Sequence, residues 1–429
     1  MFGGYDFFGN RYDALWKFDP IINQWAWIKG SNLGNSSGNF GVKGVPSLSN
    51  LPSGRSLGVA TWTDLNGDLW MYGGATFNGI MNDLWKYNIA TNIWTWIHGQ
   101  SISNQNAIYG TLGIPAATNT PGSRTETNAT WVDDNNNLWL FGGLLQTTGS
   151  INDLWKYDPL INQWTWIKGS NITGQTGVYG IKGVANPTNV PGHRMAFCHW
   201  KDSVGNFWLF GGSTYSPLNF YNDMWMYNPT TNLWTWMSGE NNFNSIGNYG
   251  QKCFPSIFKA PAARFENRCF WTDCNGNFWL YGGNKIGAFD DLWTFNPFSL
   301  EWTFVSGDSM INQNAVYGIK GVPSLFSKPG MRSGNIGWYD AIDNSLFLFG
   351  GSTTNGYKDD IWRYKIDPTC PTVIYSMPSA NFTVDSLVCQ NSCINFINKS
   401  INATSYQWYF PGRSEEHTSE LQSRFGISY

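Results

Sequence analysis

A pair of adjacent glycines returns about every 70 residues along this chain, and each pair ends a short apolar or aromatic run. The six pairs are Gly3-Gly4, Gly73-Gly74, Gly142-Gly143, Gly211-Gly212, Gly282-Gly283 and Gly350-Gly351. A fixed spacing of this length is typical of an architecture in which one supersecondary unit is copied and packs against its neighbours. We therefore expect a set of equivalent units.

Three further marks recur in the same register. A Trp-x-Trp segment and an Arg, usually after Pro or Pro-Gly, separate successive units, and an Asp-Leu-Trp triplet or a close variant follows each glycine pair. The triplets begin at Asp83, Asp153, Asp223, Asp291 and Asp360, with Asp13-Ala14-Leu15-Trp16 as a looser first copy. Turn residues such as Asn66-Gly67 divide each unit into four short runs, which we name strands a (after the Arg), b (ending in Gly-Gly), c (after Asp-Leu-Trp) and d (Trp-x-Trp). Four strands per unit predict a four-stranded antiparallel sheet, and sheets repeated around an axis make a propeller.

This combination resembles the kelch repeat over residues 1 to about 366, including the Trp-x-Tyr strand Trp85-Lys86-Tyr87. The resemblance implies an all-β, kelch-type β-propeller of at least six four-stranded blades, the first of them truncated. The unit is longer than a usual kelch repeat because its d-to-a connection is long and repeats a Tyr-Gly-x-x-Gly motif, as at Tyr109-Gly110. No Trp-x-Trp follows Tyr364, so we expect strand d of the last blade to come from sequence upstream of Met1, in a ring of six or seven blades.

The composition changes near Thr372. Asn395-Phe396 and Tyr406-Gln407-Trp408-Tyr409 resemble part of a PKD domain, an immunoglobulin-like β-sandwich of extracellular proteins, and the segment from Arg413 onward resembles a translated sequencing adapter. The expected division is a propeller at 1–368, a linker at 369–379, the N-terminal half of a PKD-like domain at 380–412 and a non-native tail at 413–429. In the PKD-like part, Cys389 and Cys393 are candidates for a short disulfide.

Composition narrows the classes of partner. Charged residues make up only 13% of the chain, the net charge is -3, and no basic stripe for nucleic acid is present. The sequence also has no apolar run long enough for a membrane-spanning helix. The chain resembles secreted adhesins and surface proteins of bacteria, and we expect an extracellular or cell-surface monomer within a longer modular chain.

The 25 tryptophans suggest carbohydrate binding, but nearly all of them occupy the recurring strand positions, which favours packing between blades. Ligand contacts are expected instead from aromatic residues outside the register, in the loops between strands b and c. The b-c loops and the d-a connections leave the same face of an up-and-down blade, and variable loops on a rigid scaffold commonly carry binding. The candidate residues are Phe77, Tyr215, Phe220, Phe289 and Tyr357.

The recurring arginines begin strand a and are expected at that same face, around the central channel. They are Arg55, Arg124, Arg194, Arg264 and Arg332. A ring of guanidinium groups could capture an anion. Alternatively, each Arg pairs with the Asp at the start of strand c, and the equal recurrence of the two opposite charges favours this second interpretation.

Catalysis has little support in the sequence. The histidines before the adapter-like tail are His98, His193 and His199, and neither a Gly-x-Ser-x-Gly elbow nor the His and Tyr set of oxidases resembling galactose oxidase can be placed. The calcium-like pattern at Asp64-Leu65-Asn66-Gly67-Asp68 is better explained as a turn. We therefore predict a non-catalytic scaffold for a protein or glycan ligand, without cofactor or metal. The alternative is a secreted galactose oxidase-like or other carbohydrate-active enzyme whose key residues lie outside this sequence.

The remaining cysteines are assigned from their positions in the register. Cys198 and Cys269 occupy equivalent places in strand a and are expected to be small apolar core residues. Cys253 and Cys274 are candidates for a disulfide, and Cys370 has no assigned partner.

Overall fold

The computed structural model describes residues 1–127, 129–146, 149–266, 269–366, 370, 382–384 and 396–398. The chain divides into two compact units, Met1–Thr372 and Val373–Tyr429. In the second unit the described residues form one antiparallel pair, β26 (Phe382–Val384) with β27 (Phe396–Asn398). The predicted disulfide between Cys389 and Cys393 and the predicted non-native tail lie outside the described residues.

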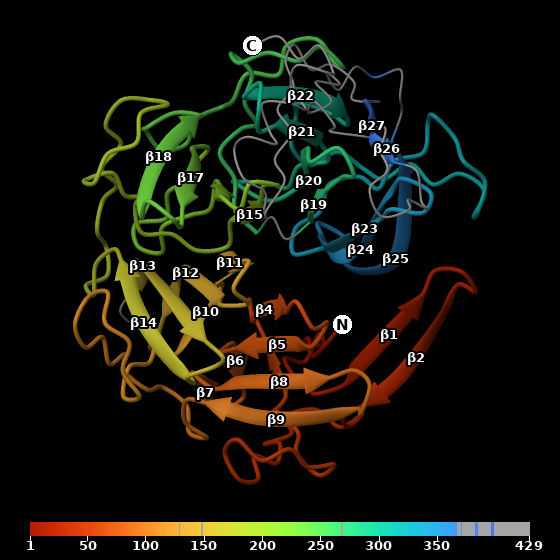
Figure 1. Cartoon of the computed structure of the whole chain (residues 1–429). Coiled ribbons are helices and arrows are strands. Elements are labelled where there is room, and N and C mark those ends of the chain that lie inside the picture. The colour runs from red at the N-terminus through yellow and green to blue at the C-terminus, as the bar shows by residue number, and fades with distance from the viewer. Residues whose placement is uncertain are drawn as a thin grey trace. The chain divides into compact units, whose positions relative to one another are not determined.

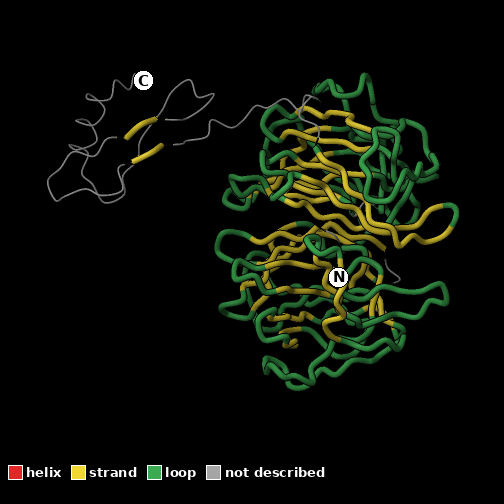
Figure 2. The backbone as a smooth tube through the Cα atoms, turned by 90° about the vertical axis from the view of Figure 1, so that its right-hand side faces the viewer, coloured by secondary structure: helices red, strands yellow, loops and turns green. Residues whose placement is uncertain are grey.

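The first unit is a ring of six antiparallel sheets, with strands and loops and no helix among the described residues (Figures 1 and 2). This is the all-β propeller that the repeat predicts. Blade 1 comprises β1 (Leu15–Asp19) and β2 (Gln24–Lys29). Blade 6 comprises β23 (Ile336–Asp340), β24 (Ser345–Thr353) and β25 (Gly356–Lys365).

Blades 2 to 5 each have four strands in the order a-b-c-d. Blade 2 consists of β4 (Ala60–Thr63), β5 (Leu69–Tyr72), β8 (Leu84–Asn88) and β9 (Ile93–His98), and blade 3 of β11 (Ala129–Val132), β12 (Leu138–Leu145), β13 (Gly149–Asp158) and β14 (Gln163–Lys168). Blade 4 consists of β15 (Cys198–Lys201), β16 (Phe207–Phe210), β17 (Met224–Asn228) and β18 (Leu233–Ser238), and blade 5 of β19 (Phe270–Thr272), β20 (Phe278–Tyr281), β21 (Leu292–Asn296) and β22 (Glu301–Ser306). Two short strands, β6 (Ala75–Thr76) and β7 (Gly79–Ile80), lie within the b-c loop of blade 2. Two others, β3 (Arg55–Ser56) and β10 (Arg124–Thr125), pair with β6 and with the end of β12.

The turns between strands a and b are closed by an aspartate. In blade 2 the Asp64 carboxylate accepts hydrogen bonds from the backbone N–H groups of Asn66 and Asp68 and from the indole N–H of Trp70. Asp133, Asp202 and Asp273 do the same in blades 3 to 5. Because these carboxylates bond their own turns, the turn interpretation of the calcium-like pattern is confirmed.

Tryptophans of the register join neighbouring blades. On strand a, the indole N–H of Trp131 donates to the backbone oxygen of Trp200 in the next blade at 2.8 Å. On strand d, Trp164 lies edge-on against Tyr72 of the preceding blade, with ring centroids 5.5 Å apart. Equivalent contacts in the other junctions pair Trp94 with Phe2, Trp234 with Phe141 and Trp302 with Phe210. Packing between blades is therefore their role, as predicted.

The ring closes between the last and the first sheet, which lie side by side in Figure 1. Trp25 of β2 packs against Phe349 of β24 with ring centroids 5.4 Å apart, and Phe18 of β1 packs against Trp338 of β23 at 5.8 Å. The first of these repeats the strand-d contact of the other junctions. The described residues thus close a six-bladed ring, in which blade 1 has strands c and d with a single bridge from Phe2 to Leu15 in the place of strand b, and blade 6 has strands a, b and c.

The long d-a connection covers the outer side of the blade that follows it. Tyr109 packs on Trp155 and Trp166 of blade 3, with ring centroids 5.1 and 4.9 Å apart, and its hydroxyl donates to Asp153 at 3.0 Å. The backbone of Ala116 also bridges to Trp164 of strand d. The connection is therefore part of the blade, and its Tyr-Gly motif marks a structural contact.

The disulfide of the propeller joins Cys253 to Cys370, so the predicted pairing of Cys253 with Cys274 is wrong. Cys253 lies in the connection over blade 5, whereas Cys274 lies in an exposed a-b turn and is free. Cys198 and Cys269 are fully buried in the core, as predicted for small apolar residues.

Candidate functional site

The recurring arginines are buried and paired within their own blades. Arg55 donates through both terminal nitrogens to Asp83 at 2.7 and 2.8 Å, and neither side chain is exposed. The same pairing joins Arg124 to Asp153, Arg194 to Asp223, Arg264 to Asp291 and Arg332 to Asp360. The pairing interpretation is thus confirmed. The alternative of an anion-binding ring is wrong, because the terminal guanidinium nitrogens donate to the aspartates and the arginine side chains are buried away from solvent.

The backbone of each arginine also holds the preceding blade. The carbonyl of Arg124 accepts a hydrogen bond from the N–H of Gly74, and its own N–H donates to the carbonyl of Met81. The guanidinium of Arg124 donates to the carbonyl of Gly142 in its own blade at 3.0 Å. We call this unit, made of the Arg, its Asp and the two glycine pairs that the Arg touches, the arginine clip. It appears at five junctions of the ring.

Electrostatics inside the clip strongly favour the ion pair. Burial alone would lower the pKa of Arg194, but the Asp223 carboxylate outweighs this effect and raises it. Tyr179 donates to Asp223 at 2.7 Å, and burial together with that carboxylate raises the pKa of the tyrosine. A buried, fully hydrogen-bonded ion pair of this kind stays charged and is strongly destabilised when one partner is removed.

The loop face contains three of the five predicted aromatic contacts. Phe77 and Tyr215 are 65% and 50% exposed in the b-c loops of blades 2 and 4, which differ in sequence. Tyr357 is 55% exposed at the start of β25 in blade 6, where its ring lies edge-on to that of Tyr5 at 5.8 Å. These three side chains therefore remain available to contact a ligand.

Phe220 and Phe289 are buried, so their prediction as ligand contacts is wrong. Phe220 packs against Phe265 with ring centroids 5.3 Å apart. The ring of Phe289 lies 4.2 Å from the Arg264 guanidinium, an arrangement that Tyr221 repeats with Arg194. Both residues just precede the Asp that begins strand c, so they are still within the register. Apolar residues at equivalent places, Met81 and Ile151, are the signal that identifies the position of Phe289 as buried.

The b-c loop of blade 1 adds exposed aromatics that the sequence reasoning missed. Phe7 and Phe8 are each 86% exposed. The Asp6 carboxylate accepts hydrogen bonds from the backbone of Phe8 and Asn10, the Asn10 amide and the Tyr12 hydroxyl, and these bonds, that of the Asn10 side chain first, lower its pKa. The sequence could have indicated these two residues, because two consecutive phenylalanines follow a glycine pair and the loop after Gly3-Gly4 is also a b-c loop.

The histidines lie apart from one another in the fold. His98 ends β9, His193 precedes Arg194 and hydrogen bonds with Ser150 at 2.7 Å, and His199 lies on β15. Burial lowers the pKa of His98 to about 4 and that of His199 to about 3. Within the described ranges, no three His, Cys, Asp or Glu side chains gather as a metal-ligand group, and no helix is long and apolar enough to cross a membrane.

Comparison with known families agrees with the architecture. Residues 111–315 match the KLHDC2/KLHL20/DRC7 Kelch-repeats domain. This range begins in the connection over blade 3 and ends in the connection over blade 6, so it contains blades 3, 4 and 5. No curated protein matches the chain. The six-sheet ring, its register and this match together define a kelch-type β-propeller.

Proposed function

We propose that this protein is a non-catalytic interaction scaffold that binds a protein or glycan on the face formed by the b-c loops and d-a connections. The match to a kelch-repeat domain supports a protein partner. One observation carries the proposal: the repeated Arg and Asp side chains are paired within the blades, whereas Phe77 and Tyr215 on b-c loops and Tyr357 at the start of β25 are at least half exposed. Variable loops on a rigid ring are well suited to recognition.

The setting that we propose is extracellular or at a bacterial cell surface, with the propeller as a monomeric module of a longer chain. The Cys253–Cys370 disulfide supports this setting, because disulfides persist mainly in oxidising compartments. The PKD-like resemblance of residues 380–412 is consistent with it. Fractionation of the native host and detection of the oxidised cysteines by mass spectrometry test the location.

Two matched variants test the binding face. The first combines Phe77→Ser, Tyr215→Ser and Tyr357→Ser on the loop face. The control combines Leu65→Ser, Val204→Ser and Ile342→Ser, which are exposed apolar residues in a-b turns on the opposite face. We expect ligands selected from a glycan array or a displayed peptide library to bind the first variant at least tenfold more weakly and the control normally. Equal loss in both variants, or no loss in either, contradicts the proposal.

The non-catalytic part of the proposal has its own test. Purified chain is assayed for bound copper and for hydrogen peroxide release with galactose and other sugars. The proposal expects neither. Copper bound at one ion per chain together with sugar oxidation would favour the oxidase alternative.

A further inference from the structure

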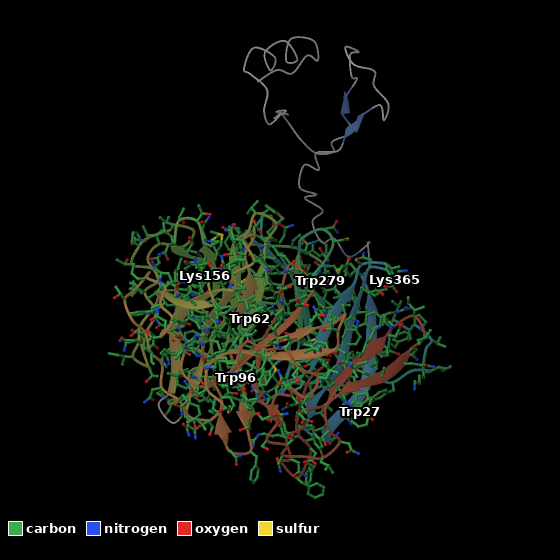
Figure 3. All side chains as sticks on the ribbon, turned by 60° about the horizontal axis from the view of Figure 1, so that its bottom comes forward. Trp27, Trp62, Trp96, Lys156, Trp279 and Lys365 are labelled. Carbon is green, nitrogen blue, oxygen red and sulfur yellow. A yellow bond between two sulfur atoms is a disulfide. The ribbon has the colours of Figure 1, made fainter. Side chains whose placement is uncertain are left out.

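The b-c loop of blade 1 holds two consecutive phenylalanines in solvent. Aromatic side chains of the register, such as Trp62 and Trp279 in Figure 3, are buried among the strands. Phe7 and Phe8 are instead each 86% exposed, more than Phe77, which like Phe7 is the fourth residue after the first glycine of its pair. Apolar surface gathered in this way is unfavourable in water and commonly marks an interaction site.

Asp6 holds this loop in one shape. Its carboxylate accepts hydrogen bonds from the backbone N–H groups of Phe8 and Asn10, each at 2.9 Å. It also accepts from the side-chain amide of Asn10 at 3.0 Å and from the hydroxyl of Tyr12 at 2.8 Å. Asn35 of the connection over blade 2 donates to the side chain of Asn10 at 2.9 Å. The two phenylalanines are thus presented by an ordered turn, which reduces the conformational entropy lost on binding.

The geometry of the loop disfavours a glycan. The rings of Phe7 and Phe8 meet edge to face, with centroids 6.0 Å apart and planes at 85°, so they do not form one flat platform for a sugar ring. Sugar hydroxyl groups also need hydrogen-bond partners when they are buried. In this loop the polar groups of Asp6, Asn10 and Tyr12 already bond to one another. Two rings at right angles instead have the shape of a knob that fills an apolar pocket.

The charge of the loops disfavours a lipid surface. Between the glycine pair and strand c, blade 1 has one basic residue, Arg11, and blade 2 has none. The Nε of Arg11 donates to the hydroxyl of Ser56 at 3.2 Å. Peripheral binding to a membrane usually combines apolar side chains with several lysines or arginines that meet anionic headgroups. A pocket on a protein, which can enclose two aromatic anchors without any charge, fits this loop better.

We propose that Phe7 and Phe8 are the anchor of the loop face for a protein partner, which receives the two rings in an apolar pocket. Tyr5 lies edge-on to Tyr357, with ring centroids 5.8 Å apart, so the anchor adjoins a residue already assigned to this face. The inference rests on the proposed binding face and narrows its ligand from a protein or glycan to a protein. Binding energy in protein interfaces is concentrated in a few enclosed side chains, so loss of these two rings removes most of the affinity.

A displayed library of small, randomised three-helix domains tests the anchor. Domains are selected on the unmodified chain and then measured against two folded variants. Phe7→Ser with Phe8→Ser removes the anchor, and Leu160→Ser with Ile161→Ser is the control, because these two consecutive apolar residues are exposed in the c-d turn of blade 3. We expect most selected domains to bind the anchor variant at least tenfold more weakly and the control normally. Normal binding of the anchor variant by most domains overturns the proposal.

The same domains separate this proposal from the proposed binding face. Domains weakened by the combined change of Phe77, Tyr215 and Tyr357 to Ser, but not by loss of the anchor, would overturn the anchor and leave the face in place. Domains weakened by neither change would contradict both.

Glycan arrays and lipid vesicles test the class of partner. The unmodified chain and the anchor variant are applied to a glycan array and are sedimented with phosphatidylcholine vesicles, with and without phosphatidylglycerol. We expect Phe7 and Phe8 to make no difference in either assay. Glycan or vesicle binding that is lost in the anchor variant overturns the assignment to a protein partner.

Discussion

At the scale of single residues, the first glycine of each pair is required by two conditions at once. Gly73 has a φ of +67°, and a Cβ there would lie 2.6 Å from the carbonyl oxygen of Arg124 in the next blade. Gly113 has a similar φ of +78°, but its Cβ would meet nothing within 4 Å. Both Gly→Ala changes cost about 1–2 kcal/mol for the left-handed backbone. Because of the clash, we expect Gly73→Ala to lower the free energy of unfolding, measured with urea, by at least about 1 kcal/mol more than Gly113→Ala does. Equal losses would show that the clip tolerates a methyl group.

The arginine clip gives a second prediction for single residues. Arg194→Ala leaves Asp223 buried without its partner, and we expect a loss of about 3–5 kcal/mol in the free energy of unfolding. Arg363, which pairs with Asp343 at 3.2 Å on the surface, is the control, and its change to Ala should cost less than about 1 kcal/mol. Chemical denaturation of both variants measures the difference. Unchanged stability of Arg194→Ala, with loss of ligand, would instead assign the arginine to binding.

His199 makes stability depend on pH. Burial lowers its pKa from 6.5 to about 3, and its Nδ1 has no hydrogen-bond partner among the described residues. Between these pH values the unfolded chain binds more protons, so the histidine's contribution to stability is complete above pH 6.5 and is lost on acidification. We expect His199→Gln to reduce the slope of stability against pH in this window by up to about 1.4 kcal/mol per pH unit. Parallel curves for the variant and the unmodified chain would contradict the assignment.

At the scale of elements, the disulfide fixes the chain after β25 to the connection over blade 5. Cys253 and Cys370 are 117 positions apart, so the bond closes a long loop. We expect Cys253→Ser with Cys370→Ser to lower the free energy of unfolding by about 2–5 kcal/mol, and Cys274→Ser, at an exposed free thiol, to leave it unchanged. Reductant should destabilise the unmodified chain and not the double variant. A destabilising effect of reductant on both would place the sensitive bond elsewhere.

Strands and their order were predictable because turns and aromatic runs repeat in one register. Pairing between an Arg and an Asp was predictable from equal recurrence. The burial of Phe289 was not recognised, since a b-c loop has no fixed length and its last residues already belong to the blade. The disulfide partner of Cys253 was also missed, because Cys370 lies outside the repeat and no register relates it to the connection over blade 5.

At the scale of the whole molecule, closure depends on contacts between the two ends of the ring. The sequence allowed six or seven blades, because a repeat count does not state which sheets touch. The contact between Trp25 and Phe349 shows that the described residues form six blades, because it joins the last blade to the first in the way that Trp164 and Tyr72 join blades 3 and 2. The candidate loop face follows from this arrangement, whereas the ligand depends on side chains that no repeat constrains.

The account's central claim is that the recurring residues build a closed ring in which β25, unlike β21, pairs with one neighbouring strand among the described residues. Hydrogen exchange of the unmodified chain, followed by mass spectrometry, tests it most directly. Two equivalent strands supply the comparison, β21, which is paired on both sides, and β25, which is paired on one. We predict slow exchange throughout β21 and fast exchange at the amides of β25 that do not bond to β24. Equal, slow exchange in both strands would contradict this difference in pairing, and fast exchange in both would contradict the ring.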